Sequence, residues 1–322
     1  MSTSLAEAPR VETTTLPSRA RGSRMKACWF ERDQIADRLD FGLATDRRAL
    51  DQAFRLQHDQ YVAQGYMDPH PSGWRLSVHH ALPFTRVFVV RDDDRVVATV
   101  TVIVDSRLGL PMEEIYADEL KGLRGEQRML AEVSGLAVHP DYQKSGLAIL
   151  LRLIRMVLLY SIQMADVSDL CIAINPHHAV FYRKAFGFEP LGGLKQYGKV
   201  NGAPALALQL DCDLLRTFIS DLRDGHAVES EVYTFLFNPG AVEPAIARLE
   251  TDLAQALPSF AHLNYFFSRH EAGTKMSSTQ QAYLRECWSA LAAVEEACAC
   301  PFRTAGPPGA FDFEPDQRLA VA

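Results

Sequence analysis

The sequence predicts an α/β protein in which a central sheet is flanked by helices and followed by a helical C-terminal extension. Between residues 47 and 210, short Val-rich runs alternate with segments of helical periodicity. Beyond Asp211, strand patterns disappear and apolar residues recur at helical spacing. A chain of 322 residues, 48% of them hydrophobic, is long enough for one large or two modest domains with a buried core.

The first predicted elements are a helix and a hairpin. Apolar residues recur along one face of residues 47–64, which predicts an amphipathic helix that ends at Gly65. The Val-rich runs 86–91 and 95–105 are separated by three aspartates, a pattern typical of two antiparallel strands joined by a tight turn.

The remaining elements are predicted from apolar runs and the residues that end them. Pro140 stops one strand, Gly187 closes one helix, and Asn201-Gly202 marks the turn of a closing hairpin. These elements are a helix, a strand, a helix, a strand, a helix and two hairpin strands, at residues 113–121, 130–138, 146–164, 169–174, 177–186, 196–200 and 205–210.

Two apolar sets with helical spacing, within residues 242–257 and 283–298, predict that the C-terminal part is helical. We expect four parts in the chain. They are a disordered N-terminus, a folded α/β domain, the helical extension and a disordered tail rich in Pro, Gly and Asp, at residues 1–24, 25–211, 212–301 and 302–322.

Composition argues against several classes of partner. The 33 basic and 40 acidic residues leave a formal net charge of -7, so we expect neither nucleic acid nor an anionic membrane surface as a partner. Residues 1–24 contain no apolar signal-peptide core. The apolar run 147–160 is interrupted by Arg152 and Arg155 and is too short to cross a bilayer. We therefore expect a cytoplasmic protein without a membrane span.

The cysteines predict no disulfide or metal framework. Six cysteines are scattered along the chain, and without an export signal we expect free thiols. Cys298 and Cys300 form a Cys-x-Cys pair, but no second pair or nearby histidine completes a metal site. We expect neither a metal ion nor a permanently bound cofactor.

The segment most informative about chemistry is the loop that precedes the long apolar helix. Small residues at a helix N-terminus leave backbone N–H groups unobstructed, and the helix dipole favours an anion there. The loop therefore predicts a phosphate site, although a plain helix start fits the same pattern. Its residues are Gln143, Lys144, Ser145, Gly146, Leu147 and Ala148.

The sequence around this loop resembles the GCN5-related acetyltransferases. Residues 136–142 look like the fourth strand of that family, and residues 143–148 match its Gln/Arg-x-x-Gly-x-Gly/Ala loop, which holds the phosphates attached to pantetheine. Asn175 and Tyr182 resemble its Asn...Tyr...Gly-Phe segment, although two small residues of that segment lie one place late. The resemblance implies that family's mixed sheet, a donor contact at Asn175, and Tyr182 as the acid that protonates the departing sulfur. A buried tyrosine that holds two helices together is the alternative for Tyr182.

Gly135 lies inside the predicted strand 130–138, where glycine indicates either a packing requirement or a bulge. The GCN5-related family uses such a bulge to admit pantetheine. By this resemblance, backbone N–H groups near Leu136 and Val138 bind the pantetheine arm and polarise the thioester carbonyl.

A narrower resemblance covers residues 51–210. The stretches 60–66, 68–75 and 105–111 look like the long-chain N-acyl amino acid synthases, especially the N-acyl tyrosine synthases. These proteins are similar to acyl-homoserine lactone synthases in taking the acyl chain from acyl carrier protein. The resemblance implies transfer of a long acyl chain from the phosphopantetheine thioester of acyl carrier protein, or from acyl-CoA, to the α-amine of an amino acid such as tyrosine.

Glu132 is the candidate base for amide formation, which needs a neutral amine. In an extended strand, Glu132 shares a face with Ser134 and Leu136, so its carboxylate projects from a largely apolar surface. A rim carboxylate paired with an arginine is the alternative. The resemblance favours the base, because acetyltransferases often place a glutamate on this strand.

The carboxylate of an amino acid acceptor needs a cation, and Arg75, Arg86 and Arg107 are the candidates. Two pairs of adjacent histidines, at 79–80 and 177–178, are expected in surface or capping roles.

An acidic carrier protein requires a local basic face on a chain with net charge -7. We expect this face to be formed by Lys121, Arg124, Arg128, Lys144, Arg183 and Lys184. Two other functions stay open: a coenzyme A-dependent acetyltransferase of a small amine, and a non-catalytic sensor of acyl carrier protein or acyl thioester.

Overall fold

The computed structural model describes residues 33–223, 230–255 and 260–297. Its centre is a seven-stranded mixed sheet in the order β1-β2-β3-β4-β5-β7-β6, which confirms the predicted fold class. Neighbouring strands are antiparallel except β4 and β5, which run parallel. The strands are β1 (Asp40–Leu43), β2 (Arg86–Asp92), β3 (Arg95–Val104), β4 (Leu130–Val138), β5 (Asp169–Ile174), β6 (Glu189–Tyr197) and β7 (Ala203–Asp211).

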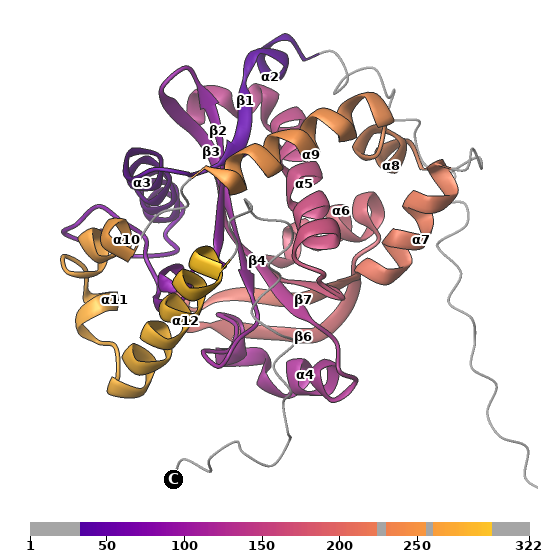
Figure 1. Cartoon of the computed structure of the whole chain (residues 1–322). Helices are drawn as coiled ribbons and strands as arrows, with labels where there is room; N and C mark the ends of the chain where they lie inside the picture. The colour runs from indigo at the N-terminus through magenta and orange to yellow at the C-terminus, as the bar shows by residue number, and fades with distance from the viewer. Residues whose placement is uncertain (1–32, 224–229, 256–259, 298–322) are drawn as a thin grey trace, which may run out of the picture.

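Helices cover both faces of the sheet. Figure 1 shows α3 on one side of strands β2 to β4, with α5 and α9 on the other side. Up to the end of β7, the helices are α2 (Gln34–Arg38), α3 (Arg47–Ala63), α4 (Glu113–Gly125), α5 (Gly146–Leu159) and α6 (Pro176–Phe186). Shorter turns are η1 (Val78–Ala81), η2 (Pro140–Ser145), η4 (Gly198–Val200) and the π-helical η3 (Tyr160–Met164).

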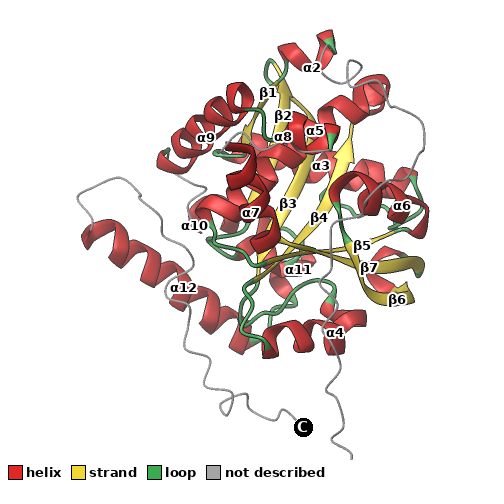
Figure 2. Ribbon diagram, turned by 90° about the vertical axis from the view of Figure 1, so that its right-hand side faces the viewer, coloured by secondary structure: helices red, strands yellow, loops and turns green. Residues whose placement is uncertain are grey.

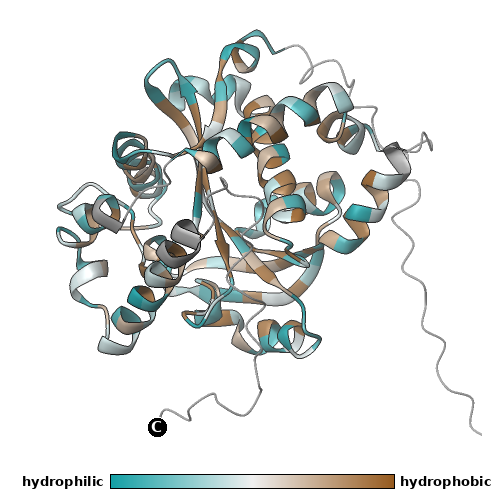
Figure 3. Ribbon diagram, in the orientation of Figure 1, coloured by the Kyte–Doolittle hydropathy of each residue, from teal (hydrophilic) through white to brown (hydrophobic). Residues whose placement is uncertain are grey.

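The sheet twists strongly along its length. Figure 2 shows β6 and β7 running nearly across the direction of β3 and β4. Coloured by hydropathy, the strands and the inner face of α5 are mostly brown, whereas the outer helix faces are mostly teal (Figure 3). The core therefore lies between the sheet and its covering helices. The helical run Pro140–Met164 is apolar and long enough to cross a membrane, but 72% of its most apolar window is buried inside the protein.

One edge strand, β1, was not predicted from the sequence. β1 has four residues and includes Gly42, so it shows no clear alternation, yet it pairs with β2 over its whole length. The extension covers this strand: Asp252 Oδ2 accepts a hydrogen bond from the Leu43 N–H at 2.7 Å, and Arg248 pairs with Asp40. A short strand of this kind is therefore stabilised by contacts that lie far away in the sequence.

The described residues after Asp211 are helical, which confirms the predicted extension. Its helices are α7 (Cys212–Arg223), α8 (Glu231–Leu236), α9 (Pro239–Ala254), α10 (Phe260–Phe267), α11 (Glu271–Thr274) and α12 (Ser278–Ala297). Buried side chains of the extension, such as Tyr233, Leu249 and Phe266, belong to the same core cluster as those of the sheet. The division at residues 211 and 212 stays a prediction, and the expected disordered ends, 1–24 and 302–322, lie outside the described residues.

Candidate active site

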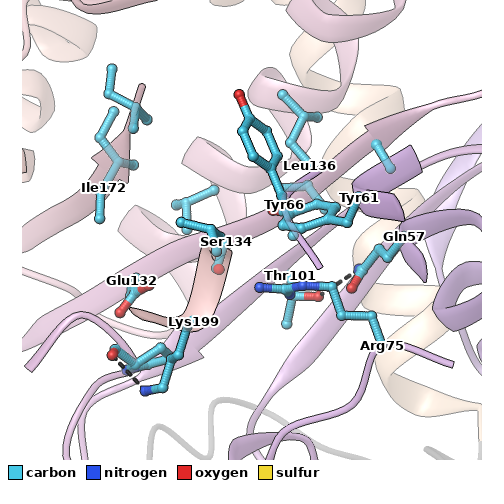
Figure 4. A pocket seen from close by; sticks show the side chains of 18 of the residues that line it. Gln57, Tyr61, Tyr66, Arg75, Thr101, Glu132, Ser134, Leu136, Ile172 and Lys199 are labelled. Atoms are coloured by element: carbon cyan, nitrogen blue, oxygen red, sulfur yellow. Dashed lines mark hydrogen bonds between the residues drawn. The ribbon is translucent and has the colours of Figure 1, made fainter. Parts of the chain in front are cut away.

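A cavity opens where two parallel strands separate. β4 and β5 pair only over Leu130 to Glu132, opposite Asp169 to Cys171. On its other side, β4 carries a register shift against β3 beside Gly135, whose φ of +68° lies in the left-handed region. This bulge bends β4 away from β5. The resulting cavity has a volume of about 690 Å³ and is lined by both strands (Figure 4).

Glu132 lies at the point of separation and is 2% exposed. Its Oε2 accepts a hydrogen bond from the backbone N–H of Met112 at 2.8 Å. Burial raises the pKa of Glu132 from 4.5 to about 7, against the opposing effects of the Met112 hydrogen bond and nearby positive charges. A carboxyl group with a pKa near neutrality suits general base catalysis. The rim position that was the alternative for Glu132 is wrong, because the side chain is buried.

Two cations lie near this carboxylate. Arg75 stands over the ring of Tyr61 at 4.1 Å and lines the cavity. Lys199 also lines it, and its Nζ donates to the carbonyl of Pro111 at 2.7 Å. Figure 4 shows Glu132 with Lys199 on one side and Arg75 further along the cavity. The charges of both cations lower the pKa of Glu132, but less than burial raises it.

The other two arginine candidates lie elsewhere. Arg86 donates to the backbone carbonyl of Pro83 at 2.6 Å and does not line the cavity. Arg107 forms an ion pair with Glu286 at 3.1 Å and also stays outside the cavity. Of the three predicted carboxylate ligands, only Arg75 lies at the site. Lys199 was not predicted, because it follows the Gln196–Tyr197 strand end in a short turn without any motif.

A buried glutamine faces the bulge. Gln57 of α3 is fully buried, and its Nε2 donates to Thr101 Oγ1 at 3.4 Å, as the dashed line in Figure 4 marks. Its Oε1 has no hydrogen-bond partner in the described part of the chain, although it lines the cavity. The oxygen is therefore available to accept a hydrogen bond from a bound molecule. No motif marks Gln57 in the sequence, where it is only one residue of an amphipathic helix.

Residues predicted to contact the donor lie along the opposite part of the cavity. Leu136, Val138 and Gln143 line it. Gln143 belongs to η2, which runs directly into α5, so the predicted loop is a helical turn rather than an open one. Gly146 has φ of -56°, and a Cβ added there would meet open space. Neither backbone conformation nor neighbouring atoms therefore require glycine at this position.

Asn175 and Tyr182 also line the cavity. The Asn175 side chain caps α6 by accepting a hydrogen bond from the His177 N–H at 3.1 Å, and it donates to Tyr66 Oη at 3.4 Å. Burial raises the pKa of Tyr182 to about 12, and its ring packs against Phe186 and other aromatic rings of this region. Its phenol is therefore a neutral proton donor. The assignment of Tyr182 as the acid stays a prediction.

One histidine pair does not lie where it was expected. His79 and His80 are buried, and His80 lines the cavity while its Nδ1 accepts a hydrogen bond from the Ser77 N–H at 3.1 Å. Burial, with a smaller effect of Arg75, lowers the pKa of His80 to about 3. The expected surface position of this pair is wrong, whereas the expected capping role is confirmed for His80, whose side chain caps the start of η1. His177, by contrast, is exposed at the start of α6.

An apolar arm extends from the strand separation beneath α5. Side chains of α5, β5, the end of α6, the link that follows it, and β7 form its walls: Leu150, Leu153, Ile154, Val157, Leu158, Leu170, Ile172, Phe186, Phe188 and Leu210. Such a surface binds hydrocarbon. The cavity thus combines an apolar arm, a buried carboxylate and a polar region at Arg75.

Two residues of the expected carrier-protein face are structural. Arg124 pairs with Asp105, with Nη2 to Oδ1 at 2.9 Å, and also with Glu113. Arg128 forms an ion pair with Asp169 that is largely buried. Both guanidinium groups are therefore occupied, and their assignment to a docking face is wrong. Lys121 is exposed on α4.

The described residues contain no group of three or more His, Cys, Asp or Glu side chains placed to hold a metal ion. The Cys298 and Cys300 pair lies outside them. Cys171, Cys212 and Cys287 are free thiols in the described part of the chain.

Comparison with known proteins identifies the family. The model of the N-acyl amino acid synthase FeeM family matches residues 52–211. The solved structure of FeeM, an N-acyl amino acid synthase from uncultured soil microbes, is 32% identical with a TM-score of 0.50, and the alignment covers 56% of this chain and 93% of that chain. The acyl-homoserine lactone synthase LasI aligns at 16% identity and a TM-score of 0.42, over 54% of this chain and 89% of that chain. No curated protein matches. The chain belongs to the FeeM family of N-acyl amino acid synthases, within the GCN5-related superfamily, and is an N-acyltransferase that forms N-acyl compounds.

Proposed function

We propose that this enzyme transfers a long-chain acyl group from the phosphopantetheine thioester of acyl carrier protein to the α-amine of an amino acid, with tyrosine as the favoured acceptor. The observation that carries this proposal is the position of Glu132, a buried carboxyl with a pKa of about 7, between an apolar arm and the cation Arg75. An acyl chain and a zwitterion need these two environments on either side of a base. We expect the enzyme to act in the cytoplasm, where carrier-bound acyl chains are made.

The proposed reaction follows from this arrangement. Ionised Glu132 takes a proton from the ammonium group of the acceptor, and the neutral amine attacks the thioester carbonyl. The C–N bond forms, the C–S bond breaks, and the departing sulfur takes a proton, for which Tyr182 is the candidate donor. The attacking nitrogen gives up its second proton as the amide forms, and this proton restores the Tyr182 phenol. The products are an amide and the free thiol of the carrier.

The donor binds across the separated strands in this proposal. The N-terminus of α5, which directly follows η2, favours the phosphate, and residues Gln143 to Ala148 are the candidates to hold it. Backbone groups near Leu136 and Val138, which β5 does not pair, are free to bind pantetheine and polarise the carbonyl. The hydrocarbon then enters the apolar arm.

The acceptor binds on the opposite side of Glu132. Arg75 presents a forked guanidinium that matches a carboxylate, and its stacking on Tyr61 restricts its position. The Gln57 Oε1, which lacks a partner in the described chain, is a candidate to accept a hydrogen bond from the acceptor. A ring on the acceptor would face Tyr61, Tyr66 and Trp74, which line this part of the cavity.

The carrier-protein donor is supported by a surface near the cavity entrance. Lys144, Arg183 and Lys184 are exposed on η2 and α6. Leu147 and Val180, on α5 and α6, are 42% and 59% exposed. Basic residues around exposed apolar side chains suit an acidic protein that presents an apolar patch of its own.

The coenzyme A alternative shares the phosphate site, so the donor must be tested directly. Arg183→Glu together with Lys184→Glu, two exposed residues of α6 outside the phosphate site, should lower the carrier-dependent kcat/KM at least tenfold and leave the acyl-CoA rate within about twofold, because only the carrier touches this surface. Added salt should reproduce the loss in the wild type. Arg48→Glu together with Arg285→Glu, an equal charge change at exposed residues of α3 and α12, is the control and should change neither rate.

Equal losses with both donors, or a wild type that is insensitive to salt, would favour coenzyme A as the donor. Because the chain belongs to an enzyme family, the hypothesis of a non-catalytic sensor is not retained. Mass spectrometry of lipid extracts from cells that express the chain tests the whole proposal. We expect new N-acyl amino acids, and their absence together with N-acetylated small amines would overturn it.

A further inference from the structure

The C-terminal extension reaches the acceptor side of the cavity. His270 and Glu271, at the start of α11, line the cavity together with His70, Trp74 and Arg75. The family match ends at residue 211, so these two residues lie outside the part of the chain that the family similarity covers. A wall of the proposed acceptor site is therefore built by a segment that the similarity does not explain.

Helix α10 anchors this wall to the acceptor loop. Phe266 is fully buried and makes edge-to-face contacts with Phe54 of α3 at 5.2 Å and with Trp74 at 5.0 Å. Trp74 is held from the other side, because its indole Nε1 donates to Asp51 at 2.9 Å. The indole is thus fixed between α3 and the extension.

His270 completes the contact between the extension and the loop. It is 7% exposed, and its ring lies 4.2 Å from the ring of His70 at an interplanar angle of 32°. Its Nδ1 accepts a hydrogen bond from the Ala272 N–H at 3.0 Å and so caps α11. The ring therefore has two separable roles, as a cap for its own helix and as a contact for the loop that carries His70.

The loop between these contacts carries the proposed carboxylate ligand. Arg75 follows Trp74 directly, and its backbone N–H donates to the carbonyl of Phe54 at 3.1 Å. The ring of Phe54, in turn, contacts Phe266 of the extension. The position of the Arg75 backbone therefore depends on side chains that α10 and α11 hold in place.

We infer that the extension is a working part of the acceptor site and that His270 is a positioning residue, which holds the His70–Trp74 loop so that Arg75 meets the acceptor carboxylate. The ligand class is an amino acid in its zwitterionic form. This inference rests on the proposed function, because it takes Arg75 as the carboxylate ligand.

Two substitutions in the full chain separate the roles of the ring. His270→Asn keeps a side chain that caps helices well, whereas His270→Ala removes both cap and ring. If the ring positions the loop, both variants should raise the acceptor KM about tenfold and leave the donor KM unchanged, and only His270→Ala should also lower Tm. The matched control is Glu286→Ala on α12, which removes an exposed ion pair with Arg107. This variant should leave both KM values unchanged.

An acceptor KM of wild-type size in both variants would overturn the inference, as would a wild-type value in His270→Asn alone, which would show that only the cap matters. Equal increases in donor and acceptor KM would also overturn it, because they indicate general loosening. Failure of the proposed function looks different. In that case the wild type itself transfers no acyl group to any amino acid.

Discussion

Replacing Glu132 by glutamine tests the catalytic assignment and the electrostatics together. The substitution keeps the size of the side chain and an oxygen that accepts the hydrogen bond from Met112, but it removes the ionisable group. We expect kcat/KM for acyl transfer to fall by about 100- to 10,000-fold, the usual contribution of a general base. Wild-type activity should rise as pH increases through about 7, where Glu132 ionises, and the variant should lack this rise.

Glu132→Gln lowers activity, but it should make the protein more stable relative to the wild type as pH rises. Because burial raises the pKa of Glu132 from 4.5 to about 7, the folded state binds its proton more tightly than the unfolded chain. The resulting stabilisation is complete below pH 4.5 and is lost as pH rises through about 7. Between about pH 5 and pH 8, the wild type should therefore lose about 2.5 kcal/mol relative to Glu132→Gln.

Denaturant unfolding of both proteins at these two pH values measures the difference, and a steady-state assay over the same range measures the rates. Activity of wild-type size in the variant at every pH would remove Glu132 from the mechanism. A stability difference that does not change with pH would show that the buried carboxyl does not ionise in this range. The two results are independent, so each part of the reasoning can fail separately.

Two glycines give further predictions. Gly146→Glu should raise the KM of the acyl donor at least tenfold, measured in the steady state, because the added negative charge would repel a bound phosphate. Tm should stay close to that of the wild type, because the added side chain meets open space. Gly135→Ala should lower the free energy of unfolding by about 1–3 kcal/mol, measured with denaturant, because φ is +68° and the new Cβ would lie 2.9 Å from the Gln57 side chain. Normal stability in Gly135→Ala would show that the bulge tolerates a side chain.

Much of the fold was predictable because it is encoded locally. The bounds of β4 and β5 agree with the predicted ranges 130–138 and 169–174, since each strand is an apolar run ended by a clear breaker. The edge strand β1 was missed because its four residues show no alternation and its pairing depends on Asp252, more than 200 residues away. A contact between residues so far apart leaves no pattern in a short stretch of sequence.

The site was predictable where a residue type coincides with a strand position or with a family motif. Glu132 stood out as a carboxylate in an apolar strand, and the structure places it in the cavity. Gln57 and Lys199 carry no motif, and their roles arise from the bulge and from a turn that only tertiary packing brings to the cavity. The basic residues near α4 were misassigned, because the sequence shows the charge of Arg124 but not the Asp105 that neutralises it.

The charges around Glu132 lead to one more prediction, about which amines the enzyme accepts. Arg75 and Lys199 both lower the pKa of this carboxyl, so one carboxyl group in the site faces two cations. A zwitterionic acceptor adds no net charge, because its carboxylate pairs with Arg75 while its ammonium approaches Glu132. An amine that lacks the carboxylate adds an uncompensated positive charge to a buried region that already holds two, and this is unfavourable at low dielectric. Tyramine should therefore show a KM at least tenfold above that of tyrosine, and Arg75→Ala should reduce this difference by raising the KM for tyrosine and lowering the KM for tyramine. Equal KM values for the two amines in the wild type would show that Arg75 does not bind the acceptor carboxylate.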